Sequence, residues 1–497
     1  MPGSLRTGCI VKDMIAKKTL IKNPLIVSNM SSVGNKKGTV MVEGQKITHV
    51  FYNQENLVNA LEQYADEIID AENMVLIPGM VNAHYHSYTN LLKGTTNNLP
   101  LEIWALYTMA YGYSLEDEDI YYSVLLGCIE MMKSGVTSCV DHFPHIAASE
   151  AALKAYDEAG MRVAFAPMLQ DVPDQQFFQV SFPPSIQKQN SQKPRASIEE
   201  MKSFFKTLIS TWHQKDGRIT VQLGPNAPQR CSENILHLCK ELSEKENLRI
   251  HTHLLETKAQ FEQSRKLYQE GIVRYLDRLG FWNEKVSAAH SVWLDDEEIQ
   301  LLADRNVSII HNPASNLLLG SGIAPIPAFL KKGANVAIGT DGSNCGTVHN
   351  LFDAMRLTAM IHRPRESDYS NWLTDATIFN MASTSGGKVL GLEGDLGRIE
   401  SGQKADLVLL GTKNSFWTPL NSPISQLIHQ ENGSSVDSVL INGEWTVRNG
   451  KTVNIDEEKI LHEVKRRQES LLEKWQEPLK RAEQLRPHFE KILLEYH

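Results

Sequence analysis

Residues 75–86 form an apolar run that ends in His84-Tyr85-His86, and this pair of imidazoles is the first feature suited to chemistry. Side chains two positions apart on a strand point the same way, so a strand here would present both rings on one face. Neutral imidazole is the commonest protein ligand for zinc-like ions, and a strand end holds it more rigidly than a loop. Alone, the pair fits two ordinary histidines near the surface equally well.

Three further apolar runs end in residues of the same chemical type. Residues 249–254 deliver His253, residues 286–290 deliver His290, and residues 336–341 deliver Asp341. Each has a structural explanation on its own, such as a core hydrogen bond for His290 or a helix cap for Asp341. Their joint occurrence at the ends of four separate runs favours a functional site.

The donor set predicts a metal site. The imidazoles of His84, His86 and His253 and the carboxylate of Asp341 suit one divalent ion that keeps a position open for water. We expect zinc, with iron or manganese as alternatives. Such an ion lowers the pKa of its water, so that hydroxide forms near neutral pH.

The residues beside these ligands predict a hydrolytic mechanism. Glu256 lies three residues beyond His253, where it would take the water proton and pass it to a substrate nitrogen or leaving group. His290 would steer the hydroxide or polarise the substrate. Asp341 is assigned both as a ligand and as a candidate base, so the predicted catalytic residues are Glu256, His290 and Asp341.

The middle of the chain alternates strands with helices. Counted with residues 75–86, the strand pattern gives eight candidates, the others being residues 136–141, 163–169, 219–224, 249–254, 286–290, 307–311 and 336–341. Helical periodicity is clear at residues 116–133, 150–159, 198–214, 232–244 and 296–304. This pattern predicts an α/β fold with a (β/α)8 barrel, and an open doubly wound sheet is the alternative. In a barrel, the C-terminal ends of the strands carry the chemistry, which is where the four runs place it.

Both ends of the chain are rich in short strands. The pattern at residues 38–47 predicts a hairpin. Short strands punctuated by glycine are predicted again at residues 404–410 and 438–450. We predict one small β domain built from both ends. The expected division is residues 1–75 and 397–455 for this domain, 76–396 for the barrel and 456–497 for a helical extension.

Composition excludes several classes of protein. The chain has 497 residues, 41% hydrophobic and 22% charged, with a net charge of -9, which argues against nucleic acid or an anionic membrane as the main partner. The six cysteines are scattered with no Cys-x-x-Cys, as expected for reduced thiols. No apolar stretch has signal or membrane-spanning length, and we predict a cytoplasmic protein.

Five segments in order carry a family resemblance: residues 78–86, 251–256, 288–290, 311–316 and 339–342. They resemble the amidohydrolase superfamily, and more narrowly its aminohydrolases and chlorohydrolases acting on purines, pterins and s-triazines. The resemblance extends from about residue 30 to residue 455. It implies a metal-bearing barrel with a composite β-sandwich, and a single metal, because residues 222–225 lack the lysine that two-metal relatives carboxylate.

The resemblance also bears on the substrate. Trp104 matches a position where similar deaminases place a tryptophan over the heterocycle, although a core tryptophan on a helix is the alternative. Asn226 is expected to hydrogen-bond a ring nitrogen or carbonyl, and Gln170 is assigned to the substrate with it. Deaminases of methylthioadenosine or S-adenosylhomocysteine hold the ribose with a glutamate about nine residues after this tryptophan, where this chain has Tyr113.

These relatives also carry a histidine where this chain has Asn226, and both differences weaken a nucleoside assignment. We therefore expect free bases or small heterocycles to be better substrates than nucleosides. The expectation depends on the absence of another carboxylate in the same space, and Glu102 and Glu116 are the two that a shifted helix would bring there.

Two segments carry less information. Residues 174–197 form a polar loop, either a lid or a surface insertion. Residues 456–497 are charged and helical and are expected to pack on the barrel or on another subunit of a homo-oligomer, a dimer or tetramer. The basic run at residues 463–467 reads as a solvated face.

The sequence thus predicts a metal-dependent hydrolase that removes an amino group from an aminated nitrogen heterocycle and releases ammonia. The alternatives are loss of chloride or an alkylamine from a triazine-like ring, and a nucleoside deaminase of the methylthioadenosine or S-adenosylhomocysteine type. A barrel without catalysis is the least favoured, because every catalytic position holds a competent residue.

Overall fold

The apolar runs in the middle of the chain form two parallel sheets in the computed structural model, which describes residues 16–496 apart from 28–35, 53, 97, 185 and 187–195. The first sheet contains β6 (Met80–Tyr85), β7 (Val136–Phe143), β8 (Arg162–Leu169), β9 (Ile219–Val221) and β10 (Gly224–Pro225). The second contains β11 (Ile250–Leu254), β12 (Val286–His290), β13 (Ser308–His311) and β14 (Val336–Ile338). Isolated parallel bridges join Tyr85 to Asp341 and Leu223 to Ile250, so the two sheets meet at both edges.

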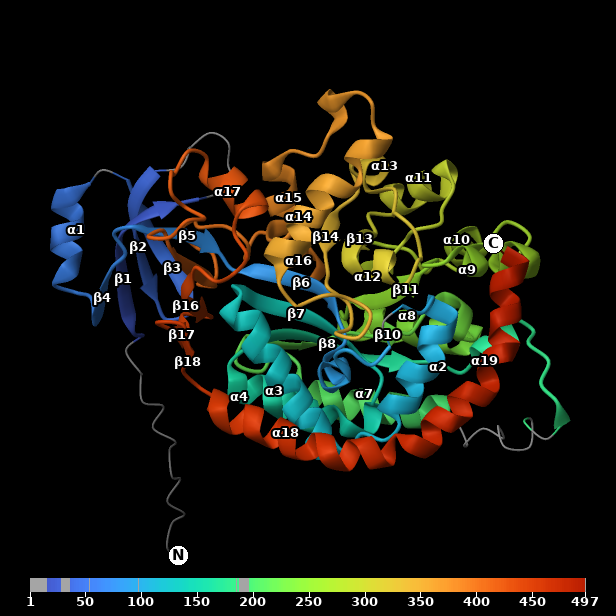
Figure 1. The fold of residues 1–497 in the computed structure, drawn as a ribbon. Coiled ribbons are helices and arrows are strands. Elements are labelled where there is room, and N and C mark those ends of the chain that lie inside the picture. The colour runs from blue at the N-terminus through green and yellow to red at the C-terminus, as the bar shows by residue number, and fades with distance from the viewer. Residues whose placement is uncertain are drawn as a thin grey trace, which may run out of the picture.

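Helices cover the outer faces of these sheets (Figure 1), which explains why residues on both faces of the strands are buried. Every residue of β6, β7 and β8 is buried. The helices of this region are α2 (Leu101–Gly112), α3 (Asp117–Lys133), α4 (Ser149–Ala159), α5 (Asp174–Phe177), α7 (Ile198–Trp212), α8 (Glu233–Glu246), α9 (Lys258–Leu267), α10 (Ile272–Arg278), α11 (Asp296–Asp304), α12 (Pro313–Leu318), α13 (Ile326–Lys331), α14 (Leu351–Ile361), α15 (Asp375–Met381) and α16 (Thr384–Val389), with short 3-10 turns at η1 (Ser87–Leu92), η2 (Ile146–Ala148), η3 (Pro228–Arg230), η4 (Arg363–Arg365) and η5 (Tyr369–Asn371).

The five helices expected from periodicity are confirmed within about two residues at each end. Three of them begin with a capping box, and Glu116 and Asp119 form the one at the start of α3. Ser197 and Glu200 exchange hydrogen bonds at the start of α7, and Asp295 and Glu298 do so at the start of α11.

The run at residues 75–86, expected to be one strand, is two. β5 (Met74–Pro78) pairs with β1 and β15 in the terminal sheet, whereas β6 pairs with β7 in the parallel sheet. The chain crosses between them at Gly79, where a Cβ atom would lie 2.2 Å from Thr137 Oγ1. Both halves are buried and apolar, so the hydrophobic pattern carries no sign of the break.

Strands from both ends of the chain form one mixed sheet, as predicted. Its nine strands are β1 (Lys18–Ile26), β2 (Lys36–Glu43), β3 (Lys46–Phe51), β4 (Glu67–Asp70), β5, β15 (Leu407–Gly411), β16 (Val436–Ile441), β17 (Glu444–Arg448) and β18 (Lys451–Thr452). The expected hairpin is the antiparallel pair of β2 and β3. This sheet lies to one side of the parallel strands, with α1 (Glu55–Glu62) beyond it and α17 (Pro423–His429) nearby (Figure 1).

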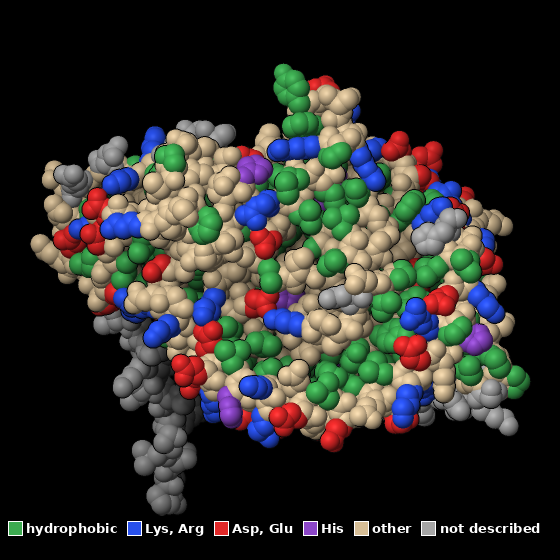
Figure 2. All heavy atoms as spheres, viewed as in Figure 1, with side chains coloured by type: hydrophobic (Ala, Val, Ile, Leu, Met, Phe, Trp, Pro, Cys, Tyr) green, Lys and Arg blue, Asp and Glu red, His purple; other side chains and the backbone are tan. Residues whose placement is uncertain are grey.

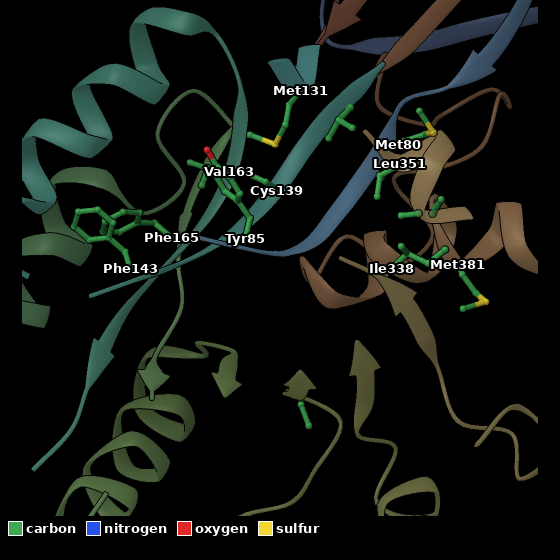
Figure 3. Packing of buried hydrophobic residues seen from close by; sticks show 14 of the residues in the cluster. Met80, Tyr85, Met131, Cys139, Phe143, Val163, Phe165, Ile338, Leu351 and Met381 are labelled. Atoms are coloured by element: carbon green, nitrogen blue, oxygen red, sulfur yellow. The ribbon is translucent and has the colours of Figure 1, made fainter. Parts of the chain in front are cut away.

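The largest core cluster lies between both parallel sheets and their helices and extends to strands of the terminal sheet. Tyr85, Cys139 and Phe165 from three neighbouring strands belong to it together with Met131 from α3 (Figure 3). The five cysteines in the described part of the chain are buried and unpaired, and Cys9 lies outside that part.

The C-terminal extension is two helices, α18 (Glu457–Lys474) and α19 (Gln476–Tyr496), which run along the outside of the molecule (Figure 1). They pack on α3 and α2 of the same chain, one of the two placements expected for this segment. Arg467 bonds to Asp119 of α3, and the Trp475 indole donates to the Tyr111 carbonyl at 3.1 Å. Arg467 is therefore an exception to the solvated face predicted for residues 463–467.

Lysines and arginines alternate with acidic residues over the face shown in Figure 2, with no extended area of one sign. Among the described residues, no helix is long and apolar enough to cross a membrane. Of the polar segment at residues 174–197, α5 is described and half of the remainder lies outside the described residues.

A buried ion pair ties the terminal sheet to the parallel strands. Arg162 of β8 forms two parallel hydrogen bonds to Asp406, Nε to Oδ2 at 2.9 Å and Nη2 to Oδ1 at 2.8 Å. Asp406 Oδ1 also accepts from the backbone of Asn442. Because both charges are fully buried, each depends on the other for compensation.

We expect Asp406→Asn to lower the free energy of unfolding by about 3–5 kcal/mol, because it leaves the Arg162 charge buried without a counter-charge. Urea denaturation measures this change. The matched control is Asp395→Asn, which removes an exposed pair with Lys46 and should change stability by about 0.5 kcal/mol or less. Equal effects of the two substitutions would contradict a special role for the Arg162–Asp406 pair.

Candidate active site

Five titratable side chains from different strands meet at the C-terminal ends of the parallel strands. His84 and His86 come from the end of β6, His253 from β11, His290 from β12, and Asp341 follows β14. Asp341 Oδ1 lies 3.5 Å from His84 Nε2 and 3.2 Å from His86 Nε2, and His86 Nε2 lies 3.3 Å from His253 Nε2. The structure thus brings together all four predicted metal ligands, with their Nε2 atoms and one carboxylate directed at a common point.

The backbone at these strand ends is strained. Leu255, His290, Ser291 and Asp341 all have positive φ, at 41°, 71°, 48° and 62°. Non-glycine residues rarely adopt this conformation, and it persists where the surrounding structure over-determines it, most often at active sites. Here it turns the His290 and Asp341 side chains toward the same centre as His84.

Burial keeps most of the imidazoles neutral. It lowers the pKa of His84 to about 3 and that of His253 well below its ordinary value. Burial also lowers the pKa of His86, but the hydrogen bond and charge of Asp341 more than offset this effect and raise it. Neutral imidazole is the form that binds metals, so a cation here would displace the proton shared between His86 and Asp341.

The residues fit a metal ion. His84 Nε2 is fully buried and has no hydrogen-bond partner among the described residues. The set of His84, His86 and His253 has its ligand atoms within 4.8 Å of one another. Two other trios with this spacing, His84 with His142 and His251, and His84 with His290 and Asp341, also contain His84.

The trio with His142 and His251 does not form a separate site, because His84 Nδ1 and His251 Nε2 already bond to each other at 2.8 Å. All three trios therefore share one centre around His84. A metal ion there has several donors to draw on, and a second ion would compete for the same atoms.

Glu256 occupies the place expected for a proton-transfer residue. Its Oε1 atom lies 3.6 Å from His290 Nδ1 and 3.3 Å from the Ser321 hydroxyl, which donates to it. Burial raises the pKa of Glu256 to about 7, and the nearby charge of Asp341 adds to this effect. A carboxyl group with such a pKa exchanges protons near neutral pH, which suits general acid and base chemistry.

Two asparagines from the segment at residues 311–316 orient His290. Asn316 Oδ1 lies 2.8 Å from His290 Nδ1, and Asn312 Nδ2 lies 3.4 Å from the same nitrogen. Neither asparagine was predicted to have a role, although both lie in a segment that carries the family resemblance. Asn312 is held close to β14, because a Cβ at Gly339 would lie 2.4 Å from its Oδ1.

The residues assigned to the substrate lie around the rim of this centre. The Trp104 indole donates to the Asn344 carbonyl at 3.1 Å, and the ring packs with Leu319 and Cys345 beside the loop that follows Asp341. Asn226 donates to Gln170 Oε1 at 2.6 Å. Both amides are thus held by protein partners while keeping further donor and acceptor capacity.

Two charged residues at this rim were missed or left open by the sequence. Arg230 is paired with Asp174 through two hydrogen bonds at 2.7 Å and 2.6 Å, and its Nη1 donates to Asn226 Oδ1 at 3.2 Å. Glu102 is buried, and its Oε1 accepts from the Thr257 hydroxyl at 2.6 Å, directly after Glu256 in the chain. Burial raises the pKa of Glu102, with smaller effects from its neighbours.

Tyr113 and Glu116, the other two residues considered for binding a sugar, lie at the surface. Tyr113 is 78% exposed, and Glu116 bonds to Lys474 at the surface. Of the two carboxylates considered for this space, only Glu102 lies beside Glu256. No local sequence signal distinguishes it, because its position depends on contact between α2 and the start of α9.

A model of the amidohydrolase family matches residues 75–446. The chain is 32% identical over 456 residues to the 5'-deoxyadenosine deaminase of Methanosarcina acetivorans. The aligned region covers 91% of this chain and 98% of the relative. It is 34% identical over 398 residues to the 5-methylthioadenosine/S-adenosylhomocysteine deaminase of Pyrococcus furiosus, covering 80% and 89%.

Solved structures share the fold at lower identity. An adenosine deaminase from Xanthomonas campestris with bound zinc superposes with a TM-score of 0.82 at 24% identity, covering 92% of this chain and 98% of that chain. An atrazine chlorohydrolase from Arthrobacter aurescens TC1 complexed with zinc gives a TM-score of 0.80 at 22% identity, covering 90% and 99%.

We expect alanine substitution of His84, His86, His253 or Asp341 to remove metal and activity together, because each contributes one of the four converging donors. Elemental analysis of purified protein measures the metal, and the wild type should hold one ion per active chain. His237→Ala, at an exposed position on α8, is the control and should retain both. Two tightly held ions, or full metal content in a ligand variant, would contradict this prediction.

We expect Glu256→Gln to keep the metal and lower kcat by about two to four powers of ten, because the amide keeps the shape and loses the base. Since a carboxyl group with a pKa of about 7 is protonated below that pH, wild-type kcat/KM should fall as the pH drops through about 7. Stopped assays across pH should show that fall in the wild type and not in the variant. Loss of metal from Glu256→Gln would instead make Glu256 a ligand.

Proposed function

The chain belongs to the amidohydrolase family, and from that premise we propose that it is a metal-dependent aminohydrolase that deaminates an aminopurine carried on a nucleoside. The observation that carries the proposal is the convergence of three imidazoles and Asp341 with Glu256 and His290 beside them. The reaction replaces the exocyclic amino group with oxygen, consuming one water and releasing one ammonia.

His84, His86 and His253 would hold one divalent ion through Nε2, and Asp341 would hold it through a carboxylate oxygen. Zinc suits a set of three imidazoles and one carboxylate, and iron or manganese are the alternatives. The shared position of His84 in every trio of donors supports a single ion. When bound, such an ion supplies an activated water as the nucleophile.

Glu256 would act on protons at the ring. In its carboxylate form it takes a proton from the attacking water, and it delivers that proton to the adjacent ring nitrogen, which loses aromatic conjugation when the nucleophile adds. His290, held by Asn316, faces both Glu256 and Asp341, at 3.6 Å and 3.8 Å. From this position His290 orients the attacking water. Asp341 accepts the second proton of that water and transfers it to the departing ammonia.

Glu102 supports a nucleoside over a free base. A carboxylate offers about four acceptor positions, and the Thr257 hydroxyl occupies one of them, so Glu102 can still accept from ribose hydroxyls. The expectation that free bases are preferred depended on there being no such group, and Glu102 now lies beside Glu256. The names of the relatives at 32–34% identity, which describe nucleoside deaminases, support the same direction.

Trp104, Asn226 and Gln170 are proposed as the remaining substrate contacts. Trp104 would stack on the purine, and Asn226, held by Gln170 and Arg230, would hydrogen-bond its edge. Hydrolysis of a triazine-like ring remains the alternative, and it is less supported because the relatives above 30% identity carry deaminase names.

We propose that the two parallel sheets, joined at both edges, form one (β/α)8 barrel, and that the terminal sheet is the composite sandwich domain. The predicted division is residues 1–75 with 397–455, residues 76–396, and residues 456–497. Its first boundary moves to Gly79, because β5 pairs within the terminal sheet as far as Pro78. A cytoplasmic location and a homo-oligomeric state also remain proposals, the first supported by the unpaired buried cysteines.

The test is kcat/KM for matched pairs of free base and nucleoside, with ammonia and chloride release followed across aminopurines, pterins and chlorotriazines. We expect adenosine-type nucleosides to exceed adenine. We further expect Glu102→Gln to lower nucleoside kcat/KM by roughly 10- to 100-fold, because a charged acceptor is lost, and to leave the free base nearly unchanged.

The control for this substitution is Glu116→Gln, which removes a surface carboxylate paired with Lys474 and should change neither substrate. A clear preference for adenine, or an equal effect of Glu102→Gln on base and nucleoside, would overturn the nucleoside assignment. Chloride release without ammonia release would overturn deamination.

A further inference from the structure

The hydrogen bond made by Nδ1 of each histidine ligand decides which ring nitrogen carries the proton. A metal ion can bind Nε2 only when that atom is bare, that is, without a proton. For His86 and His253 the answer is direct, because Nδ1 lies 2.6 Å from the carbonyl oxygens of His142 and Asn226. A carbonyl oxygen can only accept, so each Nδ1 carries the proton and each Nε2 keeps its lone pair. Backbone atoms therefore set the tautomer of both rings.

His84 differs, because its Nδ1 atom faces another imidazole. The partner is His251 Nε2 at 2.8 Å, and a neutral imidazole nitrogen either donates or accepts. If His251 donates, His84 carries its proton on Nε2, which then cannot bind an ion. The tautomer of His84 therefore depends on what lies on the far side of His251.

Ser287 lies there. Its Oγ atom is 2.8 Å from His251 Nδ1 and 3.2 Å from the Ile250 carbonyl oxygen, to which it donates. With its single proton on the carbonyl, the Ser287 oxygen accepts from His251 Nδ1. His251 Nε2 is then bare, accepts the Nδ1 proton of His84, and leaves His84 Nε2 bare.

The fold supplies this geometry through strand register. His251 and Ser287 are paired residues on the parallel strands β11 and β12, and His251 shares a face with His253 two positions later. The side chains of His84, His251 and Ser287 are all buried, so water does not compete for the hydrogen bonds between them.

We propose that His251 and Ser287 form a hydrogen-bonded relay that holds His84 in the tautomer able to bind the metal, which makes both of them positioning residues for the active site. The inference rests on the proposed function, in which His84 is a ligand. Partners of this kind commonly change metal affinity by about 10- to 100-fold when they are removed.

Removal of the Ser287 hydroxyl leaves two arrangements, and both are unfavourable. His251 can keep its Nδ1 proton, which is then buried without an acceptor. Alternatively, its proton moves to Nε2 and donates to His84, which places the His84 proton on Nε2 toward the ion. Because the metal-free variant can adopt the second arrangement and metal binding requires the first, the metal is bound more weakly without any ligand being changed.

The experiment measures the zinc dissociation constant of the full chain by competition with a chromophoric chelator. Ser287→Ala should bind zinc about 10- to 100-fold more weakly than the wild type, and Ser287→Thr, which keeps the hydroxyl, should restore affinity. Ser138→Ala is the matched control, because its buried hydroxyl on β7 has no hydrogen-bond partner among the described residues. At saturating zinc, the kcat of Ser287→Ala should return toward the wild type, which a general loss of structure would not allow.

His84→Ala separates this inference from the proposed site. Wild-type zinc affinity in His84→Ala would overturn the ligand assignment and the relay with it. Weak binding in His84→Ala together with wild-type affinity in Ser287→Ala would overturn the relay alone.

If Ser287→Ala does not fold, His251→Gln and His251→Leu decide. Glutamine still accepts from His84 Nδ1 and leucine does not. If His251→Gln binds zinc more tightly than His251→Leu does, the relay is supported. If both variants bind zinc equally weakly, the relay is overturned.

Discussion

The structure depends on burying His84 Nε2 without a hydrogen-bond partner among the described residues. Such an atom is costly inside a protein, because it has lost water and gained no hydrogen bond. Beside it the Nε2 atoms of His86 and His253 face each other at 3.3 Å, and His86 Nε2 also lies 3.2 Å from Asp341 Oδ1. An arrangement of this kind is favourable only when a cation is present to accept the lone pairs.

Much of the surrounding structure serves to hold that arrangement. Carbonyl groups fix two of the rings, Asn316 fixes His290, and residues with positive φ turn the strand ends inward. Because these contacts come from several strands, the site requires the relative register of the whole parallel assembly. The buried Arg162–Asp406 pair and the crossing at Gly79 connect that assembly to the terminal sheet, so strands from both ends of the chain are attached to the same core.

The residues proposed to contact the substrate are held differently from the metal ligands. Glu102 of α2 bonds to Thr257, and Arg230 and Asn226, which follow β10, bond to Asp174 and Gln170 and to each other. These hydrogen bonds satisfy buried polar groups and leave some of their acceptor capacity unused. Such residues can vary while the metal ligands stay the same, which fits solved structures of this fold that carry names as different as adenosine deaminase and atrazine chlorohydrolase.

The sequence alone determined the alternation of strands and helices, the small sheet at the two ends, and the residues at the ends of the strands. These features are local, because hydrophobic period and strand-end position are read within windows of about ten residues. His84, His86, His253, His290, Glu256 and Asp341 were identified in this way, and the structure brings all six together.

Tertiary structure decided the contacts between residues far apart in the chain. His84 meets His251 across 167 residues, Glu102 meets Thr257 across 155, and Arg162 meets Asp406 across 244. It also divided one apolar run into two strands of different sheets at Gly79. These outcomes follow from strand register and helix docking, which depend on packing over the whole chain and leave no periodic signal in the residues themselves.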